Sequence, residues 1–210
     1  MKNSKDYSKK IRKLYRKLKR YSLRQEPALF DEPVDALIYA TVSENITEQQ
    51  AQAAIKRLQD YFVDFNDLRV ASIDEMVEVI GKDLPSGQTI ARTLANSLRA
   101  VFEKYNMLSL QSIKKLGKRP AKLILEKITA ATPFVINYCM LTALQGHAIP
   151  LTSAMIEYLK TNMLVDANAG YEEIEGFLSR QITTKNAYDF YFRLRHECES
   201  PKKKKTRKRK

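Results

Sequence analysis

The side chains used most often for metal binding and nucleophilic catalysis are scarce in this sequence. The chain has two histidines, His147 and His196, and two cysteines, Cys139 and Cys198, without a ligand cluster around any of them. A zinc or iron-sulfur site needs about four ligands close together, and a disulfide framework needs more cysteines. We therefore predict no metal site and no cofactor. Cys139 lies in an apolar stretch and is expected in the core.

The stretch ITAATPFVINYC, Ile128 to Cys139, has the form of an active-site turn without reactive groups. Thr132 followed by Pro133 is typical of a helix start, since the hydroxyl can accept from a free amide and proline loses no helical hydrogen bond there. The nearly apolar residues that follow, to Leu144, indicate a helix buried in the core. One amine and three carboxylates elsewhere are the remaining candidates for chemistry: Lys127, Glu44, Glu157 and Asp166.

Positive charge is concentrated at the two ends of the chain. The formal net charge is +13. Residues 1–24 carry +10 and residues 201–210 carry +8, which leaves the 176 residues between them at −5. These cationic ends are expected to meet a polyanion, and nucleic acid is the first candidate because each neutralised phosphate releases counterions. Solubility and a nuclear-localisation signal are the alternatives for the C-terminal run.

The apolar residues are distributed as in a folded domain. No apolar run approaches the roughly 20 residues of a membrane span, and the N-terminus lacks the apolar segment of a signal peptide. We therefore expect a soluble, intracellular protein with no membrane partner. Five side chains in residues 9–24 lie at helical spacing: Ile11, Leu14, Tyr15, Leu18 and Tyr21. Such a stripe is typical of a helix that packs on its own domain, and a basic membrane-surface helix is the alternative.

The periodicity of apolar residues is helical along nearly the whole chain, which predicts an all-α fold. Thr47 and Ser72 are expected to cap helices, and Gly81 to end one. The expected helices cover residues 6–23, 34–42, 47–62, 72–80, 89–105, 109–116, 120–127, 133–144, 153–160, 171–178 and 186–195.

Four segments of the chain follow one another in a familiar order. They are PVDALIYATVSENITE (33–48), ITAATPFVIN (128–137), AIPLTSAMIE (148–157) and AYDFYFRLRHEC (187–198). In this order and spacing they resemble the early segment, the hairpin, the segment after the central helix and the last helix of the endonuclease III-like DNA glycosylases. Those enzymes form part of the helix-hairpin-helix (HhH-GPD) superfamily.

The resemblance covers about residues 6–198 and implies a two-lobed, all-α fold. In it, residues 1–24 form a basic amphipathic helix that packs on the second lobe. Residues 25–198 form the glycosylase-like helical domain, with its hairpin near residues 128–137. Residues 199–210 form a disordered basic tail, because a run of this composition has nothing to bury.

The sequence departs from the family at its reacting groups. Phe134 stands at the position of the catalytic lysine, and its phenyl ring can be neither nucleophile nor base. Thr152 stands at the position of the catalytic aspartate, and its neutral hydroxyl cannot offset a developing positive charge as a carboxylate does. Ala130 and Thr132 replace the hairpin glycines and are expected not to adopt a positive φ easily, which would weaken the grip of the hairpin amides on phosphate. Cys198 falls on the first cluster cysteine, but three of the four are missing, so no 4Fe-4S cluster is expected.

The resemblance also implies which residues would face DNA. Asn45 stands where the family has a glutamine that fills the space left in the base stack. Four further residues lie in or beside the hairpin: Lys127, Ala130, Ala131 and Thr132. The C-terminal cations and the N-terminal lysines would together supply most of the affinity. The C-terminal cations are Lys202, Lys203, Lys204, Lys205, Arg207, Lys208, Arg209 and Lys210. Four tyrosines near basic residues could stack on bases, although core packing explains them equally well: Tyr15, Tyr21, Tyr105 and Tyr191.

These observations predict a monomeric DNA-binding protein that contacts mainly the phosphate backbone and lacks base-excision chemistry. One alternative is an active glycosylase and lyase that uses displaced groups, with Glu44, Glu157 or Asp166 as carboxylate and Lys127 as amine. Another is a scaffold whose acidic body docks a repair or chromatin protein while its ends hold nucleic acid. The expected location is the bacterial nucleoid in the cytoplasm, or the nucleus of a eukaryote.

Overall fold

The computed structural model describes residues 4–23, 28–84 and 86–200, and in these ranges the chain forms twelve helices and no strand. The all-α prediction is therefore confirmed. The helices are α1 (Ser4–Leu18), α2 (Pro33–Ser43), α3 (Glu48–Tyr61), α4 (Phe65–Val70), α5 (Ile73–Ile80), α6 (Gly87–Tyr105), α7 (Gln111–Lys114), α8 (Lys118–Leu125), α9 (Pro133–Thr142), α10 (Ser153–Thr161), α11 (Tyr171–Gln181) and α12 (Thr184–Glu199).

Local capping explains where several helices begin. The Thr47 hydroxyl accepts from the Gln50 amide, and the Gln50 side chain accepts from the Thr47 amide, which makes a reciprocal capping box at the start of α3. Ser72 caps α5, and Gly81 ends it with a φ of 129°. Sequence periodicity missed α4, whose six residues are too few to show a helical repeat. The Asp64 side chain starts this helix by accepting from two of its amides.

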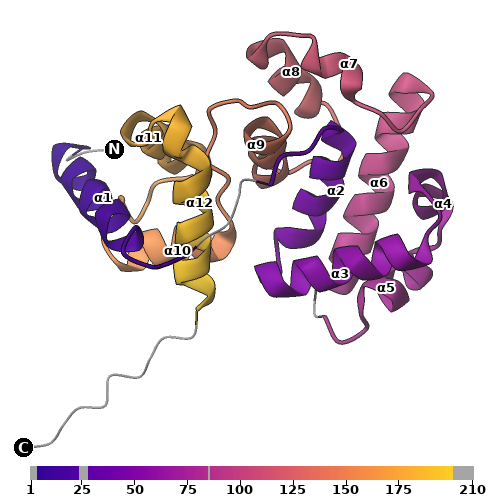
Figure 1. Ribbon diagram of the computed structural model, residues 1–210, viewed down its shortest axis with the longest axis horizontal. Helices are drawn as coiled ribbons and strands as arrows, with labels where there is room; N and C mark the ends of the chain where they lie inside the picture. Colours follow the sequence, from indigo (N-terminus) through magenta and orange to yellow (C-terminus); the bar gives the residue numbers. More distant parts are fainter. Residues whose placement is uncertain (1–3, 24–27, 85, 201–210) are drawn as a thin grey trace, which may run out of the picture.

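The helices form two groups with α9 between them (Figure 1). Helices α2 to α8 make the first lobe, in which α2 packs on α3 and α6, and α5 packs on α3 and α6. Helices α1, α10, α11 and α12 make the second lobe. Because α9 contacts α2 and α8 on one side and α12 on the other, it joins the two lobes.

The middle of the core is formed by α2 and α9. Every residue of α9 after Pro133 is buried, as its apolar sequence predicted. Helix α2 is buried on nearly all sides, because α3, α6 and α9 all pack on it. None of the helices in the described ranges is long and apolar enough to cross a membrane.

The N-terminal helix lies against the second lobe. Ile11, Leu14 and Leu18 are buried, and α1 contacts α11 and α12. The helix ends at Leu18, earlier than expected, and Tyr21 is 38% exposed beyond it. Helix α12 continues to Glu199, so the first residue of the expected tail segment is helical. The tail cations Lys202 to Lys210 lie outside the described residues.

Candidate functional site

The stretch that resembles the glycosylase hairpin is an exposed turn between α8 and α9. Ala130 lies at its tip with a φ of 66°, in the left-handed region that alanine rarely occupies. The expectation that alanine would avoid this conformation was therefore wrong. The helices on both sides of the turn fix the direction of the chain, and their packing outweighs the local cost of roughly 1 to 2 kcal/mol. The turn keeps a glycine-like backbone without a glycine.

Several backbone amides of this turn are free to bind an external acceptor. The Ala131 amide donates to the Ile128 carbonyl at 3.1 Å. Among the hydrogen bonds of the described residues, none uses the amides of Thr129, Ala130 or Thr132 as donor. Thr129 and Ala130 are exposed. Amides without an internal acceptor in a turn that precedes a helix form a site suited to a phosphate or another anion.

Thr132 starts α9 and also contacts the end of α2. Its hydroxyl accepts from the Val135 amide at 3.2 Å, as predicted from the Thr-Pro pair. Glu44, the residue that follows α2, shares a hydrogen bond with the Thr132 side chain. Burial raises the pKa of the Glu44 carboxyl, and the hydrogen bond to Thr132 offsets part of that rise. The fold thus brings one of the three candidate carboxylates to the hairpin.

A second contact links α9 to the segment before α10. The Tyr171 hydroxyl accepts from the Asn137 side chain at 3.1 Å and from the Leu151 amide at 3.3 Å. Thr152, which stands at the catalytic aspartate position of the resemblance, is 7% exposed and caps α10 by accepting from the Met155 amide at 3.3 Å. Its hydroxyl therefore has a structural role, since it completes the start of a helix.

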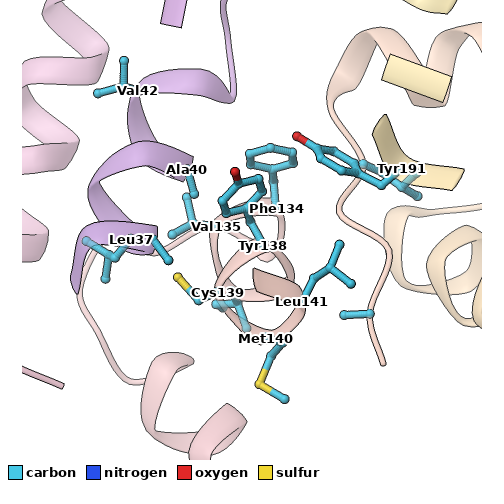
Figure 2. Close-up of a cluster of buried hydrophobic side chains, with 14 of the residues drawn as sticks. Leu37, Ala40, Val42, Phe134, Val135, Tyr138, Cys139, Met140, Leu141 and Tyr191 are labelled. Carbon is cyan, nitrogen blue, oxygen red and sulfur yellow. The ribbon is translucent and has the colours of Figure 1, made fainter. Parts of the chain in front are cut away.

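The catalytic lysine position of the resemblance is filled by an aromatic ring in the core. Phe134 is 1% exposed, and its ring lies 6.0 Å from that of Tyr138 and 6.4 Å from that of Tyr191 (Figure 2). Tyr138 in turn stacks on Tyr39 from α2, with 5.7 Å between ring centroids. These aromatic contacts connect α2 to α12 through α9, so that aromatic rings pack between the lobes around Phe134. No amine reaches the hairpin from this position.

The loop that carries Asn45 is held in place by a buried arginine. Arg195 on α12 is 2% exposed, and it donates to the Ser43 carbonyl at 2.7 Å and to the Ile46 carbonyl at 2.9 Å. It also pairs with Glu199 at 2.7 Å. Asn45 itself is exposed between the two bound carbonyls. The exposed side chain thus sits on a loop fixed from the second lobe, beside Glu44 and the hairpin.

The other predicted residues are distributed around this centre. Lys127 is exposed beside the turn and Ala131 is half-buried within it. Glu157 is exposed on α10, while Asp166 accepts from the Asn168 amide at 2.9 Å within its own turn. No hydrogen bond in the described part of the chain connects either carboxylate to the hairpin. Tyr191 is 3% exposed and cannot stack on a base, so that suggestion was wrong.

The histidines and cysteines do not assemble a metal site. The described residues contain no group of three or more histidine, cysteine or acidic side chains placed to hold a metal ion. Cys139 is fully buried on α9 and Cys198 is half-buried on α12. A 4Fe-4S cluster needs four thiolates, so the two cysteines of this sequence do not fit the cluster that the resemblance would imply.

Sequence reasoning missed Arg195 and Tyr171, which hold the site together. The four-residue spacing of Arg195 and Glu199 indicates a helical ion pair, but it does not reveal that the guanidinium is buried. Asn137 gave a stronger signal, because a lone amide in an apolar helix needs a partner. The sequence could not identify that partner as Tyr171, which lies 34 positions further along the chain.

Comparison with solved structures identifies the fold. No protein-family model and no curated protein sequence matches this chain significantly. A trapped endonuclease III–DNA covalent intermediate superposes with a TM-score of 0.71 over 93% of this chain and 90% of that one, at 17% identity. A DNA-bound 8-oxoguanine glycosylase/lyase from Clostridium acetobutylicum gives 0.66 over 93% and 70%, at 14% identity. The 3-methyladenine DNA glycosylase of H. pylori gives 0.62 over 92% and 96%, at 12% identity.

These similarities show that the chain has the two-lobed helical fold of the HhH-GPD DNA glycosylases, as the four sequence segments predicted. The fold match covers nearly the whole chain, whereas the sequence identity is low. Function has to be argued from the site itself.

Proposed function

We propose that this protein binds DNA through the hairpin between α8 and α9 and does so without lyase or glycosylase chemistry. The observation that carries this proposal is the combination at the hairpin of a retained backbone and missing reactive groups. Ala130 keeps the left-handed turn with free amides beside it, while Phe134 is buried among aromatic rings. Solved structures with this fold include DNA complexes, which supports DNA as the ligand.

The chemistry of the two replaced positions supports a binding role. Strand cleavage through a Schiff base requires an amine that attacks the sugar, and the phenyl ring of Phe134 has no amine. A developing positive charge on the sugar is stabilised by a carboxylate, and the Thr152 hydroxyl is neutral and already accepts from the Met155 amide. The turn amides need neither group to bind a phosphate, so binding would persist where catalysis is lost.

The test places a negative charge at the tip of the turn. Ala130→Asp suits this purpose, because aspartate tolerates a positive φ better than most residues and its carboxylate would repel phosphate. Ala167→Asp is the matched control, since Ala167 lies in another exposed turn. Fluorescence polarisation with a labelled duplex should show about a tenfold or larger loss of affinity for Ala130→Asp only. Equal affinities of both variants would contradict a hairpin contact.

A second function is favoured by Glu44. Its carboxylate is the one candidate acid that hydrogen-bonds the hairpin, and burial raises its pKa. A carboxyl group with a raised pKa beside a DNA-binding turn could act in base removal as a general acid or as a charge-stabilising group. In this reading the protein is a monofunctional glycosylase that needs no lysine at the position of Phe134.

Base-excision assays on a panel of damaged duplexes separate the two functions. Glu44→Gln removes the ionisable group and keeps the shape of the side chain. Glu157→Gln is the matched control, because Glu157 is exposed on α10 away from the hairpin contacts. Activity that is lost in Glu44→Gln and kept in Glu157→Gln would establish the glycosylase reading. No excision by the unmodified protein on any duplex favours the binding role.

A further inference from the structure

A groove lined by cations runs between α1 and α10 on the second lobe. It has a volume of about 660 Å³. Five cations that line it come from α1 or the turn after it, and α10 contributes an aromatic side chain: Lys10, Lys13, Arg16, Lys17, Arg20 and Tyr158. All five cations are exposed at the surface.

The spacing of these cations matches a linear polyanion. Lys10, Lys13 and Lys17 are three and four residues apart, so they form one row on the surface of α1. From Lys10 to Lys17 the row extends about 10 Å along the helix axis. Over that length one strand of a duplex presents about three phosphates. The cationic side chains along α1 thus span a length similar to that of a short run of phosphates on one strand.

Not all of these cations are engaged within the protein. Lys10 donates to the Met163 carbonyl at 2.8 Å, and Lys17 pairs with Glu197 at 2.7 Å. In the described part of the chain, the side chains of Lys13, Arg16 and Arg20 have no hydrogen-bond or ion-pair partner. Three positive charges at the groove are thus left for an external anion.

Glu197 on α12 binds two of the side chains that line the groove. It accepts from Lys17 at 2.7 Å and from Tyr158 at 3.2 Å, so that one carboxylate joins α12 to both walls. Burial alone would raise the pKa of Glu197, but hydrogen bonds from Lys17 and Tyr21 hold it below its ordinary value. The carboxylate of Glu197 therefore stays charged, and it neutralises only the positive charge of Lys17. The net charge of the six lining side chains and Glu197 is strongly positive.

The packing of α1 argues for nucleic acid and against a membrane surface. An amphipathic helix that lies on a bilayer inserts its apolar face. The apolar face of α1 is already buried, since Ile11 and Leu18 are fully covered and Leu14 is 6% exposed. Only the cationic edge of the helix is left for a ligand, and cations without insertable apolar residues suit a phosphodiester backbone.

We propose that the groove between α1 and α10 is a second DNA-binding site, which holds the phosphate backbone separately from the hairpin. The proposal extends the proposed DNA-binding function to another surface of the molecule. In Figure 1, α11 and α12 lie between α1 and the central helix α9, so the groove and the hairpin are on different parts of the fold. The two sites would grip separate stretches of backbone.

Matched triple variants test the groove in the full chain. The groove variant replaces Lys13, Arg16 and Arg20 by glutamine. The control variant replaces Lys5, Lys9 and Arg12, which are also exposed on α1 but do not line the groove. Both lose three charges. Polarisation measurements with duplex DNA across a salt series should give a log-log slope that is smaller by about 2 to 3 in the groove variant. Equal slopes for the two variants would overturn the proposal.

Site-specific crosslinking gives a readout that does not depend on a variant's stability. A photoreactive phenylalanine analogue is placed at Asn162 in the groove, or at Thr129 in the hairpin, and both positions are exposed. Crosslinks to DNA at both positions support two sites. Crosslinks at Thr129 alone would refute the groove and leave the proposed function standing, while crosslinks at Asn162 alone would do the reverse. Groove-dependent binding to phosphatidylserine vesicles, with unchanged DNA binding, would also overturn the proposal.

Discussion

Ala130 carries a side chain in a backbone conformation that usually belongs to glycine. Its φ of 66° stores strain, which the packing of α8 and α9 holds in place. The sequence predicted the location of the turn, because Thr132 and Pro133 have a local role as cap and first helical residue. It could not predict the φ of Ala130, because that angle is imposed by helices whose packing is set far along the chain.

Replacing Ala130 by glycine should stabilise the protein. Glycine avoids the cost of roughly 1 to 2 kcal/mol that a side chain adds in the left-handed conformation. Its greater conformational entropy in the unfolded chain offsets about half of this stabilisation. We expect thermal unfolding to show a Tm higher by roughly 2 °C. Ala167→Gly is the control, since Ala167 is not among the positive-φ residues of the described chain. A lower Tm for Ala130→Gly than for this control would show that the turn has another conformation.

Glu44 gives a prediction with a defined pH dependence. Burial raises its folded-state pKa above the unfolded value, so the proton binds more tightly in the folded protein. This contribution favours folding below the unfolded pKa of about 4.3 and is lost as the pH rises through the folded pKa. At neutral pH the charged carboxylate therefore opposes folding.

Glu44→Gln should accordingly have a higher Tm than the unmodified protein at pH 7, with the difference shrinking toward about pH 4 as Glu44 becomes protonated in both states. Thermal unfolding followed across this pH range measures the difference. The Glu157→Gln variant is measured beside it as an exposed control away from the hairpin contacts. A Glu44→Gln protein that is less stable at pH 7 would contradict the inferred burial of the charge.

At the scale of helices, Arg195 joins the two lobes. Its guanidinium satisfies carbonyls at the end of α2, the Tyr191 hydroxyl and the carboxylates of Glu48 and Glu199. The sequence predicted most helices through caps and apolar periodicity, and these signals are local. It did not predict the contact between α12 and the loop after α2, because Ser43 and Arg195 are 152 positions apart.

Arg195→Met should destabilise the protein by roughly 3 to 5 kcal/mol, because it leaves buried carbonyls and carboxylates without their partner. Urea unfolding measures this loss through the shift of the midpoint. Lys56→Met is the control, since Lys56 and Asp60 form an ion pair with side chains 75% and 62% exposed and should contribute less than about 1 kcal/mol. Similar midpoints for the two variants would mean that Arg195 does not hold the lobes together.

At the scale of the whole molecule, positive charge is concentrated toward the two ends of the chain, which separates it along the sequence from the mildly acidic residues between them. The basic helix α1 lies on the second lobe, and α12 ends on the same lobe at Glu199, just before the C-terminal cations. Composition was sufficient to predict this separation of charge, because it depends only on where lysines and arginines occur. The groove between α1 and α10 could not be predicted, since it requires the position of one helix beside another.

Removal of residues 201–210 should flatten the salt dependence of DNA binding. The segment carries eight positive charges, and each phosphate contact contributes about 0.9 to the slope of log affinity against log salt. A slope lower by roughly 3 to 6 is expected, with little change in sequence preference, since backbone contacts carry no base information. An unchanged slope after truncation would contradict a role for the tail in binding.

The central claim is that the hairpin binds DNA without cutting it. The most direct measurement is binding to intact duplex, abasic duplex and single strand across a salt series, with strand cleavage measured in the same tubes. Our account predicts salt-dependent binding with every strand intact, because Phe134 supplies no amine and the Thr152 hydroxyl supplies no negative charge. Cleavage of the abasic strand that persists after repurification of the protein would contradict it.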